Sequence, residues 1–228
     1  MKEQYLYLIW KDPISRRNFT VGKLSKSDKY TFNYLPEAED AKATGWDYLK
    51  SFPADETYES KTLFSAFSSR LPDPKRPDIA EVLKKYGMEK FDEFELLKRS
   101  GARLPIDTYE LIDPIFPEDK TVQRDFYVMG IRHNALCAGN NCDNLPQVEV
   151  GDTLRFVPEP DNSVDPFAIL VETCDGNTLG YVPRYYNREI LVRLDDGSTY
   201  SCVVTEVNKT AVCTECIKVR LNMPSKPE

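Results

Sequence analysis

The first part of the chain contains short runs with the pattern of β-strands. Two alternating runs, residues 5–10 and 18–24, are joined by the turn-rich segment 11–15, and aromatic rings recur at every second position over 30–34. Side chains of a strand point alternately to its two faces, so each of these runs has one apolar face. The pattern predicts a small antiparallel meander.

Helical spacing replaces this alternation further along the first half. Apolar side chains recur every three or four residues in the stretches 63–67, 79–86 and 91–97. Ser60 is a candidate N-cap for the first stretch, and Gly101 follows the third, where a residue with positive φ commonly ends a helix. We expect three helices here, which cover the apolar face of the small sheet.

The second half returns to short runs rich in valine, threonine and aromatic residues. The runs expected to form strands are 126–133, 153–157, 167–172, 178–182, 199–207 and 211–221. One helix is predicted over 186–194, where apolar side chains recur at helical spacing before the stop signal 195–197. Short strands with one helix between them indicate a small closed barrel, because closing a sheet on itself hides its edges.

These elements predict an α+β protein with a small N-terminal antiparallel sheet, covering helices and then a mainly β barrel with one helix. The segment 113–120 contains two prolines and three acidic residues, and it interrupts the periodicity on either side. We therefore expect a first domain over 1–113, a linker over 114–123, the barrel over 124–222 and a tail over 223–228.

Composition and charge narrow the possible functions. The 228 residues are 41% hydrophobic, which is enough apolar material for a core in each domain. The formal net charge is −7, and neither half has a basic surplus. A protein that coats duplex DNA needs many cationic contacts with phosphates. The charge excludes that class, so any nucleic-acid site on this chain has to be small and local.

The expected compartment is the cytoplasm. No window of about 18 apolar residues predicts a membrane span, and the first residues lack the apolar stretch of a signal peptide. Six cysteines in a chain of this length are too few for a disulfide scaffold. We therefore expect thiols or metal ligands in a reducing compartment, and no membrane partner.

Four of the cysteines raise the question of a zinc site. Cys213 and Cys216 form a C-x-x-C pair, and Cys137 and Cys142 form a C-x4-C pair. Four thiolates hold zinc when both pairs form tight turns. The first pair lies in a run expected to be a strand, where residues three apart face opposite sides. Buried or loop thiols are therefore the favoured interpretation, zinc is the alternative, and no cofactor is expected.

Four sequence pieces in the second half resemble a known family. They are Y-V-M-G-I-R-H at 127–133, V-G-D-T-L-R-F at 150–156, E-P-D-N-S-V-D-P-F-A-I at 159–169 and L-G-Y-V-P-R at 179–184. In this order they resemble the HIRAN domain, a barrel related to the OB-fold, and the resemblance covers about residues 124–208. It implies that the expected barrel is OB-like.

The resemblance also implies a ligand and a set of contacts. In eukaryotic remodelling enzymes the HIRAN domain captures the 3′-hydroxyl end of single-stranded DNA. Matched by position, Arg132 and Arg184 would contact phosphates, and Asp165 would accept a hydrogen bond from the terminal hydroxyl. His133 falls where the family has a ring that stacks on a base. Val164 falls where the family has a tyrosine. Tyr181 or Tyr185 could supply the missing ring. The candidate DNA-binding residues are Arg132, His133, Asn162, Asp165, Tyr181, Arg184 and Tyr185.

Several of these residues also have a plain structural interpretation. Asn162 and Asp165 precede a predicted strand, where such side chains commonly bond their own backbone in a turn. Asp161, Asp165 and Glu172 could form the carboxylate set of a metal nuclease. No lysine follows them at a workable spacing, and the chain has a single histidine. The sequence therefore predicts a binding protein without enzymatic activity.

The first half resembles a second family. The pieces are V-G-K-L at 21–24, Y-T-F-N-Y at 30–34, L-F-S-A-F-S-S-R-L-P-D at 63–73 and F-E-L-L-K-R-S-G at 94–101. They are similar to the N-terminal subdomain of HipA-type toxin kinases, over about residues 4–112. No glycine-rich phosphate loop or H-R-D sequence follows, so the kinase body is missing.

That second resemblance implies a role in a toxin–antitoxin system. A detached N-terminal subdomain acts as the antitoxin in tripartite systems of this kind, which implies docking on a separately encoded HipA-like kinase. The apolar candidates for the docking face are Trp46, Phe64, Phe67 and Leu71, and the alternative is that they form the core. The competing function is a protein–protein interaction module that binds no nucleic acid.

Overall fold

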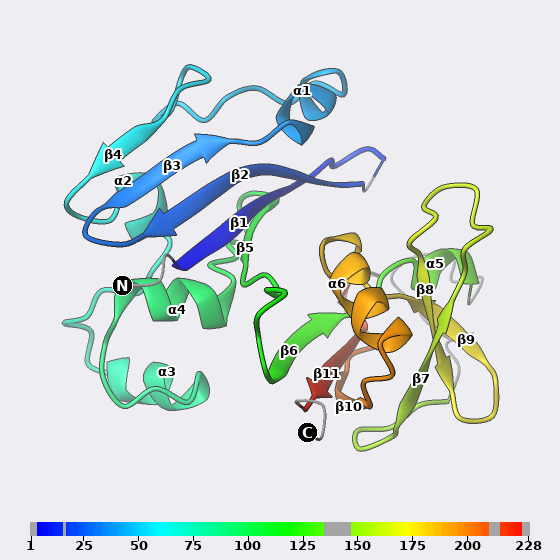
Figure 1. The fold of residues 1–228 in the computed structure, drawn as a ribbon. Helices are drawn as coiled ribbons and strands as arrows, with labels where there is room; N and C mark the ends of the chain where they lie inside the picture. The colour runs from blue at the N-terminus through cyan, green and yellow to red at the C-terminus, as the bar shows by residue number, and fades with distance from the viewer. Residues whose placement is uncertain (1–3, 16, 135–146, 210–214, 225–228) are drawn as a thin grey trace. The chain divides into compact units, whose positions relative to one another are not determined.

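The chain folds into two compact units, Met1–Pro114 and Ile115–Glu228. The computed structural model describes residues 4–15, 17–134, 147–209 and 215–224. Both units consist of antiparallel sheets with a few helices, which confirms the α+β class (Figure 1). Within the described ranges, no helix has the length and apolar character needed to cross a membrane.

The first unit is built on one five-stranded antiparallel sheet, in the order β4-β3-β2-β1-β5 (Figure 1). Its strands are β1 (Gln4–Lys11), β2 (Asn18–Lys26), β3 (Tyr30–Tyr34), β4 (Tyr58–Ser60) and β5 (Tyr109–Ile112). The first three strands form the predicted meander. The two edge strands were not predicted, since three or four residues are too few to show a period.

Four short helices accompany this sheet. They are α1 (Glu37–Lys42), α2 (Ser65–Ser68), α3 (Ile79–Lys85) and α4 (Glu93–Ser100). The last three are the predicted helices, and α1 is an addition. Gly101 ends α4 with a φ of 68°, as expected. The prediction for Ser60 is wrong: it is the last residue of β4, and Phe64 occupies the N-cap position of α2.

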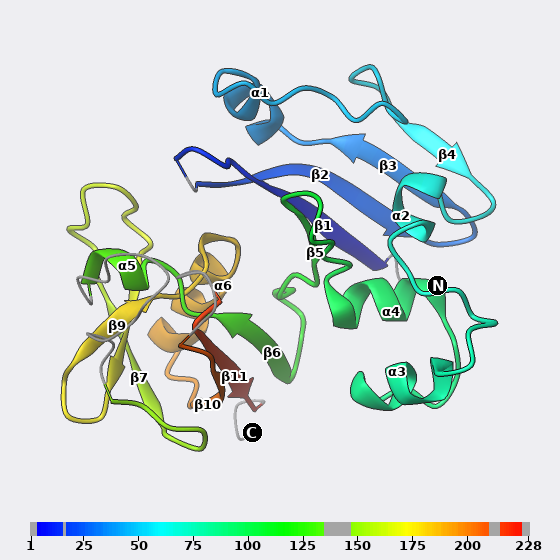
Figure 2. The same ribbon diagram turned by 180° about the vertical axis from the view of Figure 1, so that it is seen from behind.

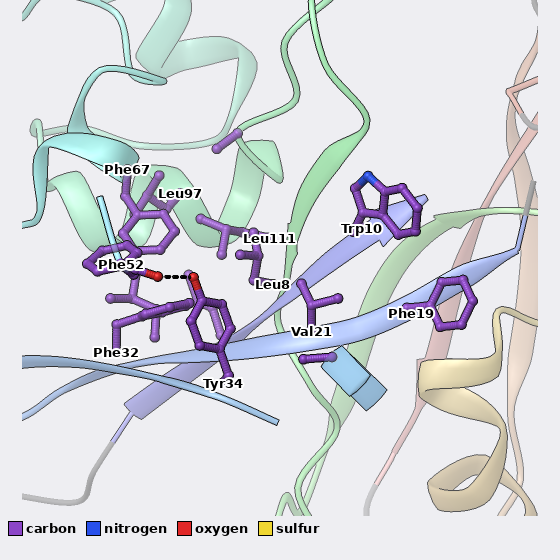
Figure 3. Packing of buried hydrophobic residues seen from close by; sticks show 14 of the residues in the cluster. Leu8, Trp10, Phe19, Val21, Phe32, Tyr34, Phe52, Phe67, Leu97 and Leu111 are labelled. Atoms are coloured by element: carbon purple, nitrogen blue, oxygen red, sulfur yellow. Dashed lines mark hydrogen bonds between the residues drawn. The ribbon is translucent and has the colours of Figure 1, made fainter. Parts of the chain in front are cut away.

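Aromatic rings form the centre of the first core (Figure 3). The rings of Phe32 and Phe52 stack with centroids 4.3 Å apart, and Phe67 packs 5.5 Å from Phe32. The Tyr34 hydroxyl donates to the Phe52 carbonyl at 2.6 Å, and burial raises the pKa of that tyrosine. The rings therefore join the sheet to the segments that follow it, with one buried polar group satisfied.

This core corrects the expected docking face. Trp46 and Phe67 are buried within the aromatic cluster, and Phe64 and Leu71 are half-buried against it. A side chain that fills the core cannot also cover a partner, because exposing it would leave a cavity. The structural alternative is therefore correct for Trp46 and Phe67, while Phe64 and Leu71 pack against this core with part of their surface exposed.

The partly buried Arg70 joins the segment after α2 to the segment before β5. The guanidinium of Arg70 donates to both carboxylate oxygens of Asp107, at 2.6 and 2.8 Å, and to the Ala102 carbonyl at 2.7 Å. Burial acts to raise the pKa of Asp107, but the hydrogen bonds from Arg70 and from the Tyr109 backbone N–H, together with the charge of Arg70, lower the pKa by more than burial raises it. The R-L-P-D part of the second sequence pattern thus has a structural role.

Two three-stranded antiparallel sheets, in the orders β10-β11-β6 and β7-β8-β9, make up the second unit. The strands are β6 (Val122–Tyr127), β7 (Leu154–Pro158), β8 (Ile169–Thr173), β9 (Thr178–Tyr181), β10 (Ser201–Val207) and β11 (Ile217–Met223). Among the described residues the sheets are linked by the single bridges Met129–Tyr181 and Thr153–Val203. No continuous ladder closes there, so the expected closed barrel is corrected to two bridged sheets.

Among its described residues, the second unit also contains two helices. Helix α6 (Arg184–Asp195) is the predicted helix, begun two residues earlier. Residues 131–133 were expected to continue a strand, but they lie in α5 (Ile131–Asn134), because Gly130 turns the chain with a φ of 71°. Helix α5 packs beside β9, which Figure 2 shows from behind. Arg132 therefore lies on a helix and not on a strand as expected.

The segment before β6 is held against α6. Arg193 donates to the carbonyls of Phe116 and Asp119, at 2.8 and 2.9 Å, and Ile115 is buried. At the other end of the unit, Met223 is the last residue of β11 and is buried. Part of the expected linker and the first residue of the expected tail therefore belong to the folded unit.

Candidate functional site

The loop between β7 and β8 is shaped by its own polar side chains. Asn162 Oδ1 accepts hydrogen bonds from the backbone N–H groups of Val164 and Asp165, at 3.0 and 3.1 Å. Its amide nitrogen donates to Glu159 Oε2 at 2.9 Å. The structural interpretation of Asn162 is therefore confirmed, because its side chain replaces the backbone partners that a loop lacks.

Asp165 is held in place by two donors and lies close to a third. Its Oδ1 accepts from the Phe167 backbone N–H at 3.0 Å, and its Oδ2 accepts from the amide of Asn187 at 2.8 Å. The Arg184 Nε lies 3.6 Å from Oδ2. The carboxylate side chain is 15% exposed. Each oxygen can accept a further bond, so the group is a fixed acceptor with capacity for a ligand.

Asn187 positions this acceptor, although it is not among the candidate residues predicted from the sequence. It is one of the few buried polar residues, 3% exposed, and it comes from α6 rather than from the loop. Its place three residues after Arg184 puts both side chains on one helix face, which is the signal that could have indicated it. An amide at this position bridges helix and loop without adding charge.

Tyr181 connects the loop to the bridge between the sheets. Its backbone exchanges two hydrogen bonds with Met129, at 2.8 and 2.7 Å. Burial, followed by its hydrogen bond with Glu159, raises the pKa of the phenol. The Asn162 side chain acts in the opposite direction and lowers that pKa. The phenol therefore lies close to the loop side chains of Glu159 and Asn162.

The remaining candidates lie on the two helices. Arg184 is the exposed first residue of α6, and Tyr185 is half-buried with its ring 4.7 Å from that of Tyr186, edge to face. Arg132 is exposed on α5, which packs beside the strand that carries Tyr181. The side chain of His133 lies outside the described residues. The structure thus gathers Asn162, Asp165, Tyr181 and Arg184 around one loop.

The geometry gives less support to a metal nuclease or to a zinc site. Glu172 forms an ion pair with Arg155 across the β7–β8 ladder at 3.2 Å, and Asp165 accepts a hydrogen bond from Asn187. Within the described part of the chain, no three histidine, cysteine or acidic side chains gather in a group able to hold a metal ion. Cys216 is buried directly before β11. Cys137, Cys142 and Cys213 lie outside the described residues, so the zinc hypothesis stays a prediction.

Comparisons with known proteins follow the same division into halves. Residues 123–222 match the family model described as HIRAN domain, and residues 14–105 match the model described as HipA N-terminal domain. None of the curated proteins compared with this chain matches it.

Two solved structures are similar to this chain. A protein from Lactobacillus plantarum is 24% identical, over 45% of this chain and 94% of that chain, with a TM-score of 0.36. The HIRAN domain of human HLTF is 15% identical, over 46% of this chain and 80% of that chain, with a TM-score of 0.35.

The chain is therefore a two-domain protein assembled from two recognised modules. It contains a HipA N-terminal domain in its first half and a HIRAN domain in its second, and both resemblances drawn from the sequence are confirmed. The HIRAN match reaches residue 222 rather than 208, which takes in β11 and so both sheets of the second unit.

Proposed function

We propose that the second unit binds the 3′ end of single-stranded DNA at the loop between β7 and β8. The observation that carries this proposal is the fixed carboxylate of Asp165, which has two donors in place and Arg184 beside it. An ionised carboxylate only accepts hydrogen bonds, so it suits a ligand that ends in a hydroxyl donor. The HIRAN match supports nucleic acid as the ligand class.

The charge of the chain limits how strong this binding can be. Few cations lie at the proposed site, and the net charge of −7 repels a polyanion. Affinity for DNA falls with each phosphate contact that is missing. We therefore expect a dissociation constant of about 1 µM or weaker at physiological salt. We infer that the site binds without catalysis.

Reversing the charge of Arg132 or Arg184 should remove most of the binding. Arg132→Glu and Arg184→Glu each replace a proposed phosphate contact with a repulsive charge, so we expect at least about tenfold weaker binding of a short single strand. Fluorescence anisotropy of a labelled oligonucleotide measures this. Arg220→Glu is the control, because Arg220 pairs with Asp125 on the other sheet and the net charge changes equally.

The comparison between these variants separates a local site from general repulsion. A local site predicts that Arg220→Glu binds nearly as well as the parent protein. Equal weakening in all three variants, or none in Arg132→Glu and Arg184→Glu, contradicts the proposal. The competing function, an interaction module without nucleic-acid binding, then becomes the better account of the second unit.

The first unit supports a second candidate function. Residues 14–105 match the HipA N-terminal domain, and the HIRAN unit follows them along the chain. We propose that this unit docks on a separately encoded HipA-like kinase and regulates it as an antitoxin does. The proposed partners share one compartment, and we propose the cytoplasm.

Co-expression tests this second proposal directly. The full chain and a HipA-like kinase from the same genome are expected to elute as one complex in size-exclusion chromatography, and kinase activity is expected to fall on addition of the chain. A kinase from an unrelated organism serves as the control for non-specific association. Separate elution of the native pair at micromolar concentration contradicts the docking proposal and leaves the DNA proposal untouched.

A further inference from the structure

A second contact lies beside the Asp165–Asn187 hydrogen bond, between the same loop and the same helix. The guanidinium carbon of Arg188 lies 4.2 Å from the centroid of the Phe167 ring. Phe167 follows Asp165 by two residues, and Arg188 follows Asn187 directly. Two consecutive residues of α6 thus contact the loop. Asn187 donates a hydrogen bond to Asp165, and Arg188 makes a cation–π contact with Phe167.

Both side chains of this second contact face solvent. The Phe167 residue is 37% exposed, and Arg188 is exposed as well. Within the described part of the chain, Arg188 forms no ion pair with a carboxylate. A planar guanidinium that rests on a ring loses much of its freedom, while its outer face stays open to a ligand.

We propose that Arg188, which lies over the ring of Phe167, is a stacking platform for a base near the 3′ end of the bound strand. This inference rests on the proposed function of the second unit. Nucleobases stack on arginine planes as well as on aromatic rings, and the same cation attracts the phosphates of that strand. Arg184 lies one helical turn before Arg188, so the two cations follow one line along α6.

The position of the platform explains why it acts together with Asp165. The Phe167 backbone N–H is one of the two donors that hold the Asp165 carboxylate. A strand whose terminal hydroxyl reaches Asp165 therefore passes the residue that carries the ring. One contact recognises the end of the strand, and the other holds a base without regard to its identity, because every base has a flat face.

Two substitutions test the platform, one that keeps the positive charge and one that keeps the apolar character. Arg188→Lys keeps the positive charge but has no plane, and Phe167→Leu keeps an apolar side chain but has no ring. Each is expected to weaken binding of a 3′-hydroxyl strand about tenfold. Arg220→Lys on β11 is the matched control and should leave the affinity unchanged. Thermal unfolding verifies that each variant is folded.

A fluorescent base gives a readout that affinity alone does not. We expect 2-aminopurine at one of the last three nucleotides to be quenched when the parent protein binds, and this quenching to disappear with Arg188→Lys at saturating protein. Arg188→Ala should in addition lower the slope of log affinity against log salt by about 1, whereas Arg188→Lys should not.

The outcomes separate this inference from the proposed function. If the parent binds 3′-hydroxyl strands but shows no quenching at any of the three positions, the platform is wrong and the end-binding proposal stands. The same holds if Arg188→Lys and Phe167→Leu bind and quench as the parent does. If the parent binds no single-stranded DNA, both proposals fall.

Discussion

A single strand that ends in a 3′-hydroxyl is expected to bind this protein up to about a hundredfold more tightly than the same strand ending in a 3′-phosphate. The Asp165 carboxylate can accept a hydrogen bond from the hydroxyl, but it repels a phosphate at the same place. A hydrogen bond to a charged group contributes about 1.5–3 kcal/mol, which sets the size of the expected preference. Competition titrations with the two strands measure it.

Two substitutions locate the origin of this preference. Asp165→Ala removes the acceptor, so it should abolish the preference and weaken binding of the hydroxyl strand. Asn187→Leu leaves the carboxylate in place but removes the amide that donates to it at 2.8 Å. We expect an intermediate preference, because Asn187 acts by positioning Asp165. Ser163→Ala, an exposed change in the same loop, is the control.

Strands without a free 3′ end complete this test. A circular single strand offers phosphates and bases but no terminal hydroxyl, and it should bind as weakly as the 3′-phosphate strand. The state of the 5′ end should have no effect. Equal affinities of the parent protein for the hydroxyl, phosphate and circular strands would mean that Asp165 only stabilises the loop and does not recognise the 3′ end.

The second large effect is expected at Gly180, where Gly180→Ala should destabilise the second unit by about 3 kcal/mol or more. A Cβ atom there would lie 2.3 Å from the Met129 carbonyl oxygen and 2.9 Å from a methyl group of Val128. The oxygen belongs to the backbone, and it accepts from the Tyr181 N–H at 2.7 Å in the bridge between the sheets. The clash is therefore relieved only by breaking that bridge.

Calorimetry and fluorescence together measure this loss. Both tryptophans, Trp10 and Trp46, belong to the first unit, so their emission reports on that unit alone. We expect a calorimetric transition to fall by about 10 °C or more in Gly180→Ala, while the tryptophan transition stays in place. Thr178→Ala, on the same strand, is the control. A parent-like transition in Gly180→Ala contradicts the close approach of the two sheets.

Local patterns were sufficient for the elements that carry a clear period or a strong end signal. Aromatic rings recur at every second position in β3, and α4 ends at Gly101, whose positive φ few other residues adopt readily. Helix α6 was predicted because its apolar side chains recur over three turns. Loop residues Asn162 and Asp165 were also predicted from the sequence, since their hydrogen bonds with the loop backbone reach only two or three residues along the chain.

Elements without a period were missed or misassigned. Strand β5 has only four residues and gains its identity by pairing with β1 about a hundred positions earlier. Residues 131–133 have the composition of a strand, yet the turn at Gly130 directs them into α5. Trp46 and Phe67 looked equally suited to a partner face and to a core, because exposure is a property of the folded chain.

The sequence by itself determined which two modules make up this protein and which side chains shape the loop before β8, because both depend on residues close together along the chain. Only the tertiary structure decided that Asn187 donates to Asp165, that Arg188 lies over Phe167, and that Arg70 holds Asp107. Each of these contacts joins residues about 20 or more positions apart. Their geometry depends on how helices pack against sheets, which no local spacing encodes.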